Sequence, residues 1–154
     1  MKKRNIVLTV AALTVAAGAG AIAYNVVTTQ KQMKGYDKKV SFKGEAVKFE
    51  DTFDSASYAV NYSGLHMDFT KATLKNNMGQ LALFGNFSGI DIVVPKGWRV
   101  IANGVNHGSG INNACANLLS DDQPVLFVTY NMKLSGLNIR SEKEEVIEIE
   151  EQNA

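Results

Sequence analysis

Cysteine is almost absent from this 154-residue chain, and proline and histidine are scarce. The single Cys115 excludes an intrachain disulfide framework and a cysteine-rich zinc cluster. It also lies too far from the N-terminus to be a lipid-anchor cysteine. The two histidines, His66 and His107, are 41 positions apart, which is not a ligand spacing. No calcium loop of alternating aspartates occurs either, so the sequence predicts no bound metal.

Patterns for cofactor, nucleic-acid and catalytic chemistry are also missing. The glycine-rich stretch Gly104–Gly110 lacks the lysine and the following helix that a phosphate-binding loop requires. The chain has no dense basic stripe interleaved with aromatic residues, so it predicts no nucleic-acid partner. His107 and Cys115 are the only pair that would suggest nucleophilic catalysis, which needs a base within hydrogen-bond reach. We interpret them instead as a turn residue and a small buried side chain. The sequence predicts a non-enzymatic protein without cofactors.

One long uncharged segment stands at the N-terminus. Ile6–Val27 contains no charged residue and follows Lys2, Lys3 and Arg4. At about 1.5 Å per residue, a helix of this length reaches about 33 Å, enough to cross the roughly 30 Å hydrocarbon core of a bilayer. The alternative is a secretory signal peptide, with a small-x-small cleavage pattern directly before Tyr24. Either interpretation places the rest of the chain outside the cytoplasm.

The segments around this apolar run complete the expected organisation. Residues 1–5 form a cytoplasmic N-terminus and residues 6–27 a single-pass membrane anchor, an orientation favoured by the charges that abut the run. Residues 28–45 are polar and without sustained periodicity, which indicates a juxtamembrane stalk. Residues 46–142 form the folded domain. Residues 143–154 are an acidic tail that either adds a last strand or remains solvated.

A repeated motif dominates the predicted domain. An aromatic or apolar residue, a Ser-Gly pair and then alternating apolar and polar residues recur three times, and a weaker fourth copy is present. The four pairs are Ser63-Gly64, Ser88-Gly89, Ser109-Gly110 and Ser135-Gly136. They are separated by 25, 21 and 26 residues. A nearly constant period in the twenties is typical of a solenoid, in which each coil packs only against its neighbours.

The residues around each Ser-Gly pair predict a tight turn followed by a strand. Glycine accepts a positive φ, which lets the chain turn without a Cβ clash. After the turn, Leu65, Met67 and Phe69 alternate with polar residues and therefore share one face of a strand. Equivalent apolar residues follow the other copies, and further strands are expected at Gly79–Asn86, Trp98–Ala102 and Val125–Tyr130. We expect an all-β fold, a short β-solenoid or right-handed β-helix-like domain. An antiparallel β-sandwich is the alternative.

Three further residues are candidates for contact or chemistry. Trp98 is the sole tryptophan and either packs on the end of the solenoid or forms an exposed contact. Asp68 and Asp91 follow Ser-Gly pairs at offsets of four and two residues, so they would stack on adjacent coils. Paired carboxylates are what a glycan-acting enzyme requires, and such an enzyme is the alternative to a non-catalytic module.

The central part of the chain resembles a known family. The segments Phe69–Leu74 (FTKATL), Leu81–Pro95 (LALFGNFSGIDIVVP) and Gly97–Val100 (GWRV) resemble the C-terminal domain of the LiaF-like, cell-wall-active antibiotics response family. Asp68 and Ala72 fit the family's acidic-to-alanine start, whereas Ser88 stands where glycine is usual. The likeness covers roughly residues 50–142 and includes no catalytic residue.

The resemblance implies a right-handed β-helix-like domain that acts in the cell-envelope stress response or in surface interaction. Together with the predicted anchor at residues 6–27, it leads us to expect a non-catalytic bacterial envelope protein. Its expected partners are the membrane and a protein or wall component of the envelope. A purely structural surface spacer is the remaining alternative.

Overall fold

The structure is a computed structural model that describes residues 28–143, and the chain divides into two compact units at Tyr36. In the first unit, the described part is a short helical segment that ends in the 3-10 helix η1 (Met33–Gly35). Within residues 28–143, no helix is long and apolar enough to cross a bilayer. The predicted anchor (6–27), the N-terminus before it (1–5) and nearly all of the acidic tail (143–154) lie outside the described residues.

The second unit is built almost entirely of strands. Strands make up 59% of the described chain, so the all-β prediction is confirmed. The strands before residue 75 are β1 (Lys38–Ser41), β2 (Gly44–Lys48), β3 (Thr52–Phe53), β4 (Ser55–Asn61), β5 (Gly64–Asp68) and β6 (Thr73–Leu74). After the 3-10 helix η2 (Lys75–Asn77) come β7 (Met78–Asn86), β8 (Gly89–Val94), β9 (Arg99–His107), β10 (Gly110–Asn113), β11 (Val125–Lys133) and β12 (Gly136–Ser141).

These strands form two five-stranded sheets and one two-stranded sheet. Sheet A has the order β1-β4-β7-β11-β9, sheet B has the order β10-β12-β8-β5-β2, and sheet C pairs β3 with β6. Every pair among the described strands is parallel. The antiparallel sandwich that we considered as an alternative is therefore wrong. The Ser-Gly pattern did not distinguish the two folds, because such turns also occur in hairpins, where they join antiparallel strands.

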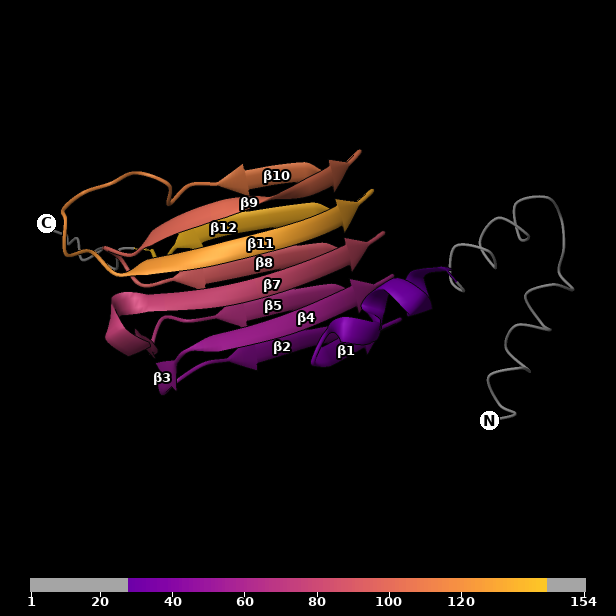
Figure 1. The fold of residues 1–154 in the computed structure, drawn as a ribbon, viewed down its shortest axis with the longest axis horizontal. Coiled ribbons are helices and arrows are strands. Elements are labelled where there is room, and N and C mark those ends of the chain that lie inside the picture. Colours follow the sequence, from indigo (N-terminus) through magenta and orange to yellow (C-terminus); the bar gives the residue numbers. More distant parts are fainter. Residues whose placement is uncertain (1–27, 144–154) are drawn as a thin grey trace, which may run out of the picture. The chain divides into compact units, whose positions relative to one another are not determined.

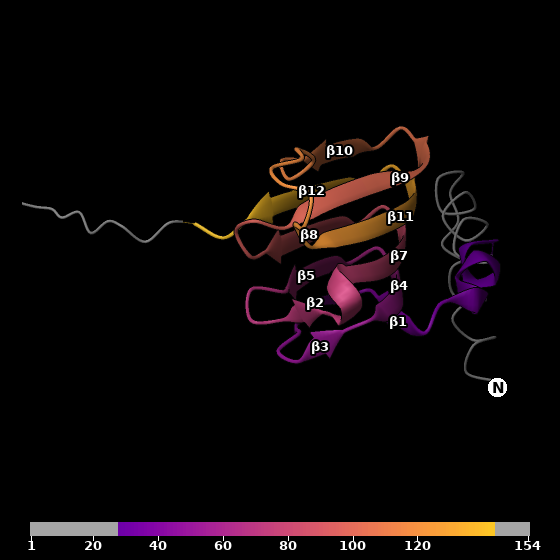
Figure 2. The same cartoon turned by 60° about the vertical axis from the view of Figure 1, so that its left-hand side comes forward.

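Each strand of sheet A continues through a two-residue corner into a strand of sheet B, and we call each such unit a rung. Rung 1 is β1–β2, rung 2 is β4–β5, rung 3 is β7–β8, rung 4 is β9–β10 and rung 5 is β11–β12. The rungs lie one above another, with sheets A and B as two layers (Figures 1 and 2).

The order of the rungs in space differs from their order in the chain. Rung 5 lies between rungs 3 and 4, because β11 pairs with both β7 and β9, and β12 pairs with both β8 and β10. Rung 5 carries apolar inward residues such as Leu126, Met132 and Ile139, whereas the matching positions of rung 4 include Gly104 and Asn106. The more apolar rung is thus covered on both sides, and the more polar rung is left at the end, next to water.

The first rung lies within the segment predicted as a stalk. β1 and the first residues of β2 fall inside residues 28–45, and the compact unit begins at Asp37. The predicted boundary at residue 46 is therefore too late. This rung was missed because exposed Lys38 and Glu45 stand level with the buried Tyr58 and Leu65 of rung 2, and because Lys43 replaces the serine of the motif. An end rung tolerates polar residues at these positions because one of its sides faces solvent.

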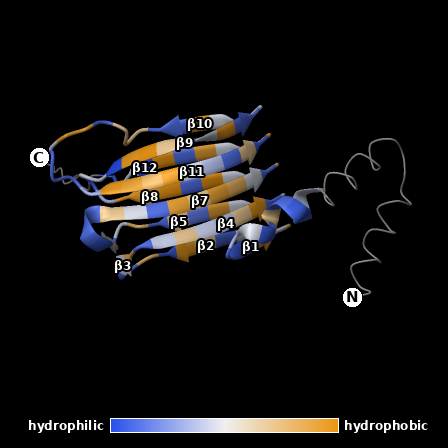
Figure 3. Ribbon diagram, in the orientation of Figure 1, coloured by the Kyte–Doolittle hydropathy of each residue, from blue (hydrophilic) through white to orange (hydrophobic). Residues whose placement is uncertain are grey.

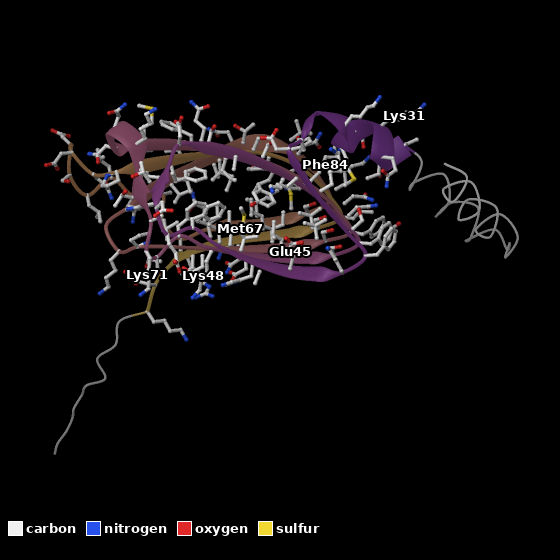
Figure 4. All side chains as sticks on the ribbon, turned by 90° about the horizontal axis from the view of Figure 1, so that it is seen from below. Lys31, Glu45, Lys48, Met67, Lys71 and Phe84 are labelled. Carbon is white, nitrogen blue, oxygen red and sulfur yellow. The ribbon has the colours of Figure 1, made fainter. Side chains whose placement is uncertain are left out.

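The core fills the space between the sheets. Leu65, Met67 and Phe69 are at most 3% exposed, as their alternation predicts, and Met67 projects between the two layers (Figure 4). Hydrophobic and hydrophilic residues alternate along the stacked strands (Figure 3). The remaining predicted core residues are also buried: Ile90, Ile92, Val94, Leu137 and Ile139.

Candidate functional site: the corner and the outer face of sheet B

The Ser-Gly pairs align in the stack. The glycine that opens each strand of sheet B pairs in register with the glycine of the next strand. In spatial order this column is Gly44, Gly64, Gly89, Gly136 and Gly110. The column has one member more than the sequence predicted, because the corner Phe42-Lys43-Gly44 belongs to it.

The glycines of this column do not make the turn, which corrects the expected role of their positive φ. The residue two positions earlier adopts the left-handed conformation: φ is 51° at Tyr62, 50° at Phe87 and 46° at Leu134. Only rung 4 has a glycine there, Gly108, with φ of 74°. Bulky residues rarely adopt this region, so the local geometry was not readable from residue type.

Serine has a defined role at the corner. The Ser88 hydroxyl donates to the Asn86 carbonyl oxygen (2.8 Å) and accepts the backbone N–H of Ser63 in the next rung (3.1 Å). Ser135 repeats both bonds, to the Lys133 carbonyl and from the Ser88 N–H, at 2.8 and 3.0 Å. The hydroxyls therefore form a ladder that joins the backbones of adjacent rungs.

The serine ladder ends differently at its two ends. Lys43 in rung 1 donates its N–H to the Ser63 hydroxyl and needs no hydroxyl of its own, since no described rung lies beyond it. At the other end, Ser109 donates its N–H to Asn106 Oδ1 at 2.7 Å, within its own rung. Asn106 thus replaces the missing neighbour. The ladder follows the spatial order of the rungs and not their order in the chain.

The glycine column forms the floor of an open groove. A Cβ atom built on any of these five glycines would meet no atom within 4 Å. The groove has a volume of about 890 Å³ and is lined by the glycines and by the next two residues of β2, β5, β8 and β12. We call this groove the glycine trough. It runs across the strands of sheet B on the outer face.

A row of polar side chains borders the trough, one per strand and two residues beyond the glycines. His66 Nδ1 lies 2.8 Å from Asp91 Oδ2 in the next strand. Asn138 Nδ2 donates to Asp91 Oδ1 (3.0 Å), and Asn112 Nδ2 donates to Asn138 Oδ1 (2.7 Å). We call these four residues the polar ladder. It crosses four adjacent strands without a break.

Asp91 is the electrostatic centre of the polar ladder. Arg140 donates two hydrogen bonds to its carboxylate, from Nε at 3.2 Å and from Nη2 at 3.0 Å. The bonds from Arg140, followed by those from Asn138 and His66, hold the pKa of Asp91 below its usual value, although partial burial opposes this shift. The carboxylate is therefore ionised at neutral pH and is matched by the guanidinium charge.

An apolar ridge stands at the corner, just before the glycine column. Phe42, Tyr62 and Phe87 stack with ring centroids 5.4 and 5.1 Å apart and interplanar angles of 4° and 10°. Leu134 continues the ridge on rung 5. Phe42, Phe87 and Leu134 are 62%, 43% and 55% exposed. Each residue stands two positions before a column glycine, and two residues of chain span at most about 7 Å.

The other predicted site residues do not join this surface. Trp98 is 7% exposed and packs on Phe69, with ring centroids 6.0 Å apart, so it belongs to the core. Cys115 is buried and its carbonyl oxygen accepts the Val100 N–H. Val100 and His107 lie seven residues apart on β9, which is about 23 Å, so Cys115 and His107 are not a catalytic pair.

The two aspartates of the alternative, enzymatic hypothesis do not stack level. Asp91 is level with His66, whereas Asp68 is level with Val93. Asp68 accepts bonds from the backbone N–H and the hydroxyl of Thr70, which lower its pKa. The expectation that the two carboxylates stack on adjacent coils is wrong. Their offsets of four and two from the glycine already separated them by two residues.

Sequence reasoning missed the polar ladder and the trough, although a signal existed. The residue two positions after each column glycine is polar in four of five copies: His66, Asp91, Asn112 and Asn138.

Among residues 28–143, no group of three or more His, Cys, Asp or Glu could hold a metal ion. Comparison with known proteins gives no match: no family model, no curated protein and no solved structure is similar enough to be assigned to this chain.

Proposed function

We propose that this protein is a non-catalytic surface-interaction module of the bacterial cell envelope. Its domain is a short β-solenoid, carried outside the cytoplasm by the apolar segment at residues 6–27. Two observations support the solenoid: the parallel, in-register pairing of five rungs and the serine ladder that joins them. The LiaF-like resemblance of residues 50–142 supports an envelope stress-response role on sequence grounds alone.

The observation that carries the proposal is the glycine trough beside the polar ladder. A groove of about 890 Å³ on an outer sheet face, bordered by hydrogen-bonding side chains, suits a ligand or partner laid across the strands. A purely structural spacer would need neither feature. We therefore place the contact surface of the module on the outer face of sheet B.

The electrostatics of the surface favour binding over catalysis. A glycan-acting enzyme needs one carboxyl group with a raised pKa as its general acid. The pKa values of Asp68 and Asp91 are both lowered, by Thr70 and by Arg140 respectively. Both side chains are ionised at neutral pH and therefore cannot donate the proton that glycoside cleavage requires.

Site-specific photocrosslinking in intact cells tests the proposal. A photoreactive amino acid replaces either Asn112, at the exposed end of the polar ladder, or Thr129, on the outer face of sheet A. We expect adducts from position 112 that disappear when Gly89→Leu fills the trough, and none from position 129. Equal adducts from the two positions, or no adducts from either, would contradict the proposed contact surface.

A further inference from the structure

We propose that the glycine trough binds an uncharged glycan strand that lies along the stack, across the strands of sheet B. This inference rests on the proposed contact surface and names the chemical class of its ligand.

The fold does not explain the column glycines, although it explains the other glycines of the domain. Gly97 and Gly108 have positive φ. A Cβ on Gly104 would lie 1.9 Å from the Tyr130 carbonyl oxygen, and one on Gly79 or Gly85 would press on core side chains. The column glycines show neither constraint, since their φ is not positive and a Cβ on each would enter open space. Five glycines in register therefore keep the backbone accessible to something outside the domain.

The floor of the trough suits a flat ligand with an apolar face. The backbone polar groups of sheet B bond within the sheet, so the glycines present mainly their CH₂ groups. Five strands spaced by about 4.8 Å give a floor of about 19 Å. Glycan strands offer such faces of C–H groups, with hydroxyl groups along their edges.

The polar ladder can bind those hydroxyl groups with both donors and acceptors. Asn138 and Asn112 each use one amide hydrogen within the ladder, and each amide carries a second one. Asp91 already accepts four bonds, two from Arg140 and one each from Asn138 and His66, so the acceptor that the ladder offers is the side-chain oxygen of Asn112, which accepts no bond within the ladder. These groups repeat from strand to strand, which matches a ligand with a repeating pattern of hydroxyls.

The charges beside the trough balance, which indicates an uncharged ligand. Asp91 is paired with Arg140, and Glu45 lies 3.7 Å from the ammonium of Lys43. The residues that line the trough include no lysine or arginine that would attract a phosphate or carboxylate polymer. The stacked rings of the ridge face one another, and none of them is among the residues that line the trough, so the floor carries the contact.

Calorimetric titration of the full chain in detergent micelles tests the proposal. The probes are β-1,4-linked glucose and N-acetylglucosamine oligomers of two to six sugars, with glycerol-phosphate polymer as the charged comparison. We expect one uncharged series to bind at least about 10-fold more tightly as hexamer than as dimer, because the longer chain covers more of the trough. Changing the salt from about 0.05 to 0.5 M should alter this affinity less than about 2-fold.

Variants link the binding to the trough. Gly89→Leu fills the floor and is expected to weaken hexamer binding at least about 10-fold, while Asn138→Ala interrupts the ladder and weakens it less. Thr129→Leu adds the same bulk on the outer face of sheet A and should leave binding unchanged. Equal urea midpoints for the three variants show that they fold.

Several outcomes would overturn the inference: no uncharged oligomer binds, the charged polymer binds instead, or Gly89→Leu binds as tightly as the unmodified chain. Crosslinks from position 112 that lead to a protein would leave the contact surface in place and remove only the glycan assignment. Absence of both crosslinks and oligomer binding would remove both.

Discussion

Replacing Ser88 with alanine isolates the contribution of one hydroxyl in the serine ladder. The hydroxyl accepts the partly buried N–H of Ser63 and donates to the Asn86 carbonyl oxygen. That carbonyl also accepts the Tyr62 N–H at 2.9 Å, so it stays paired in the variant. The Ser63 N–H loses its acceptor. An unpaired donor in a partly buried position costs about 1–3 kcal/mol, which is the expected loss in the free energy of unfolding.

Ser63→Ala is the matched control because it removes the same hydroxyl one rung away. Its hydroxyl accepts the N–H of Lys43, which is exposed at the end of the stack. Water can replace that acceptor, so we expect a loss below about 1 kcal/mol. Urea unfolding of the two full-length variants, followed by circular dichroism, compares the losses. Equal losses, or a larger loss for Ser63→Ala, would refute the claim that the ladder works by pairing buried N–H groups.

Three further changes test other parts of the domain. Gly104→Ala should destabilise the domain by at least about 2 kcal/mol in urea unfolding because its Cβ would strike the Tyr130 backbone, whereas Gly110→Ala, which meets open space, should be nearly neutral. The lowered pKa of Asp91 contributes stability that is present above about pH 4 and is lost as the pH falls through the lowered value, so the stability deficit of Asp91→Asn should be largest near pH 6 and shrink near pH 3. Burial raises the pKa of Cys115, so an aromatic disulfide reagent should label it at neutral pH only after the domain unfolds.

The strand content and the inward faces were predictable because period-two alternation reports burial directly. Leu65, Met67 and Phe69 are apolar at every second position, and a parallel stack buries that face. The repeating Ser-Gly pairs also marked where each corner ends and the next strand begins. Both features depend on local sequence, so they can be predicted without knowing which distant segments pair.

The order of the rungs was not predicted, because it depends on competition between distant segments for the interior of the stack. Burying Met132 and Ile139 between two rungs is more favourable than burying Asn106 and Asn113 there. The order of the residues along the chain does not show this difference between distant segments. The first rung was missed for a related reason, since its exposed Lys38 conceals the alternation. End rungs are the least patterned because solvent covers one side.

The trough escaped prediction because its signal was assigned to the turn. Gly64 and Gly89 were expected to supply positive φ, a role that Tyr62 and Phe87 take instead. Because those residues adopt the positive φ, the turn does not require the glycines. Only the register of the strands shows that they form one continuous surface.

Backbone amide mapping by NMR tests the central claim most directly. The isotopically labelled full chain in micelles is titrated with the tightest-binding uncharged hexasaccharide. We expect the amide signals of Gly64, Gly89 and Gly136 and the side-chain amide of Asn138 to shift together, while that of Thr129 on sheet A does not. Shifts confined to sheet A, or a spectrum that does not change at saturating oligosaccharide, would contradict it.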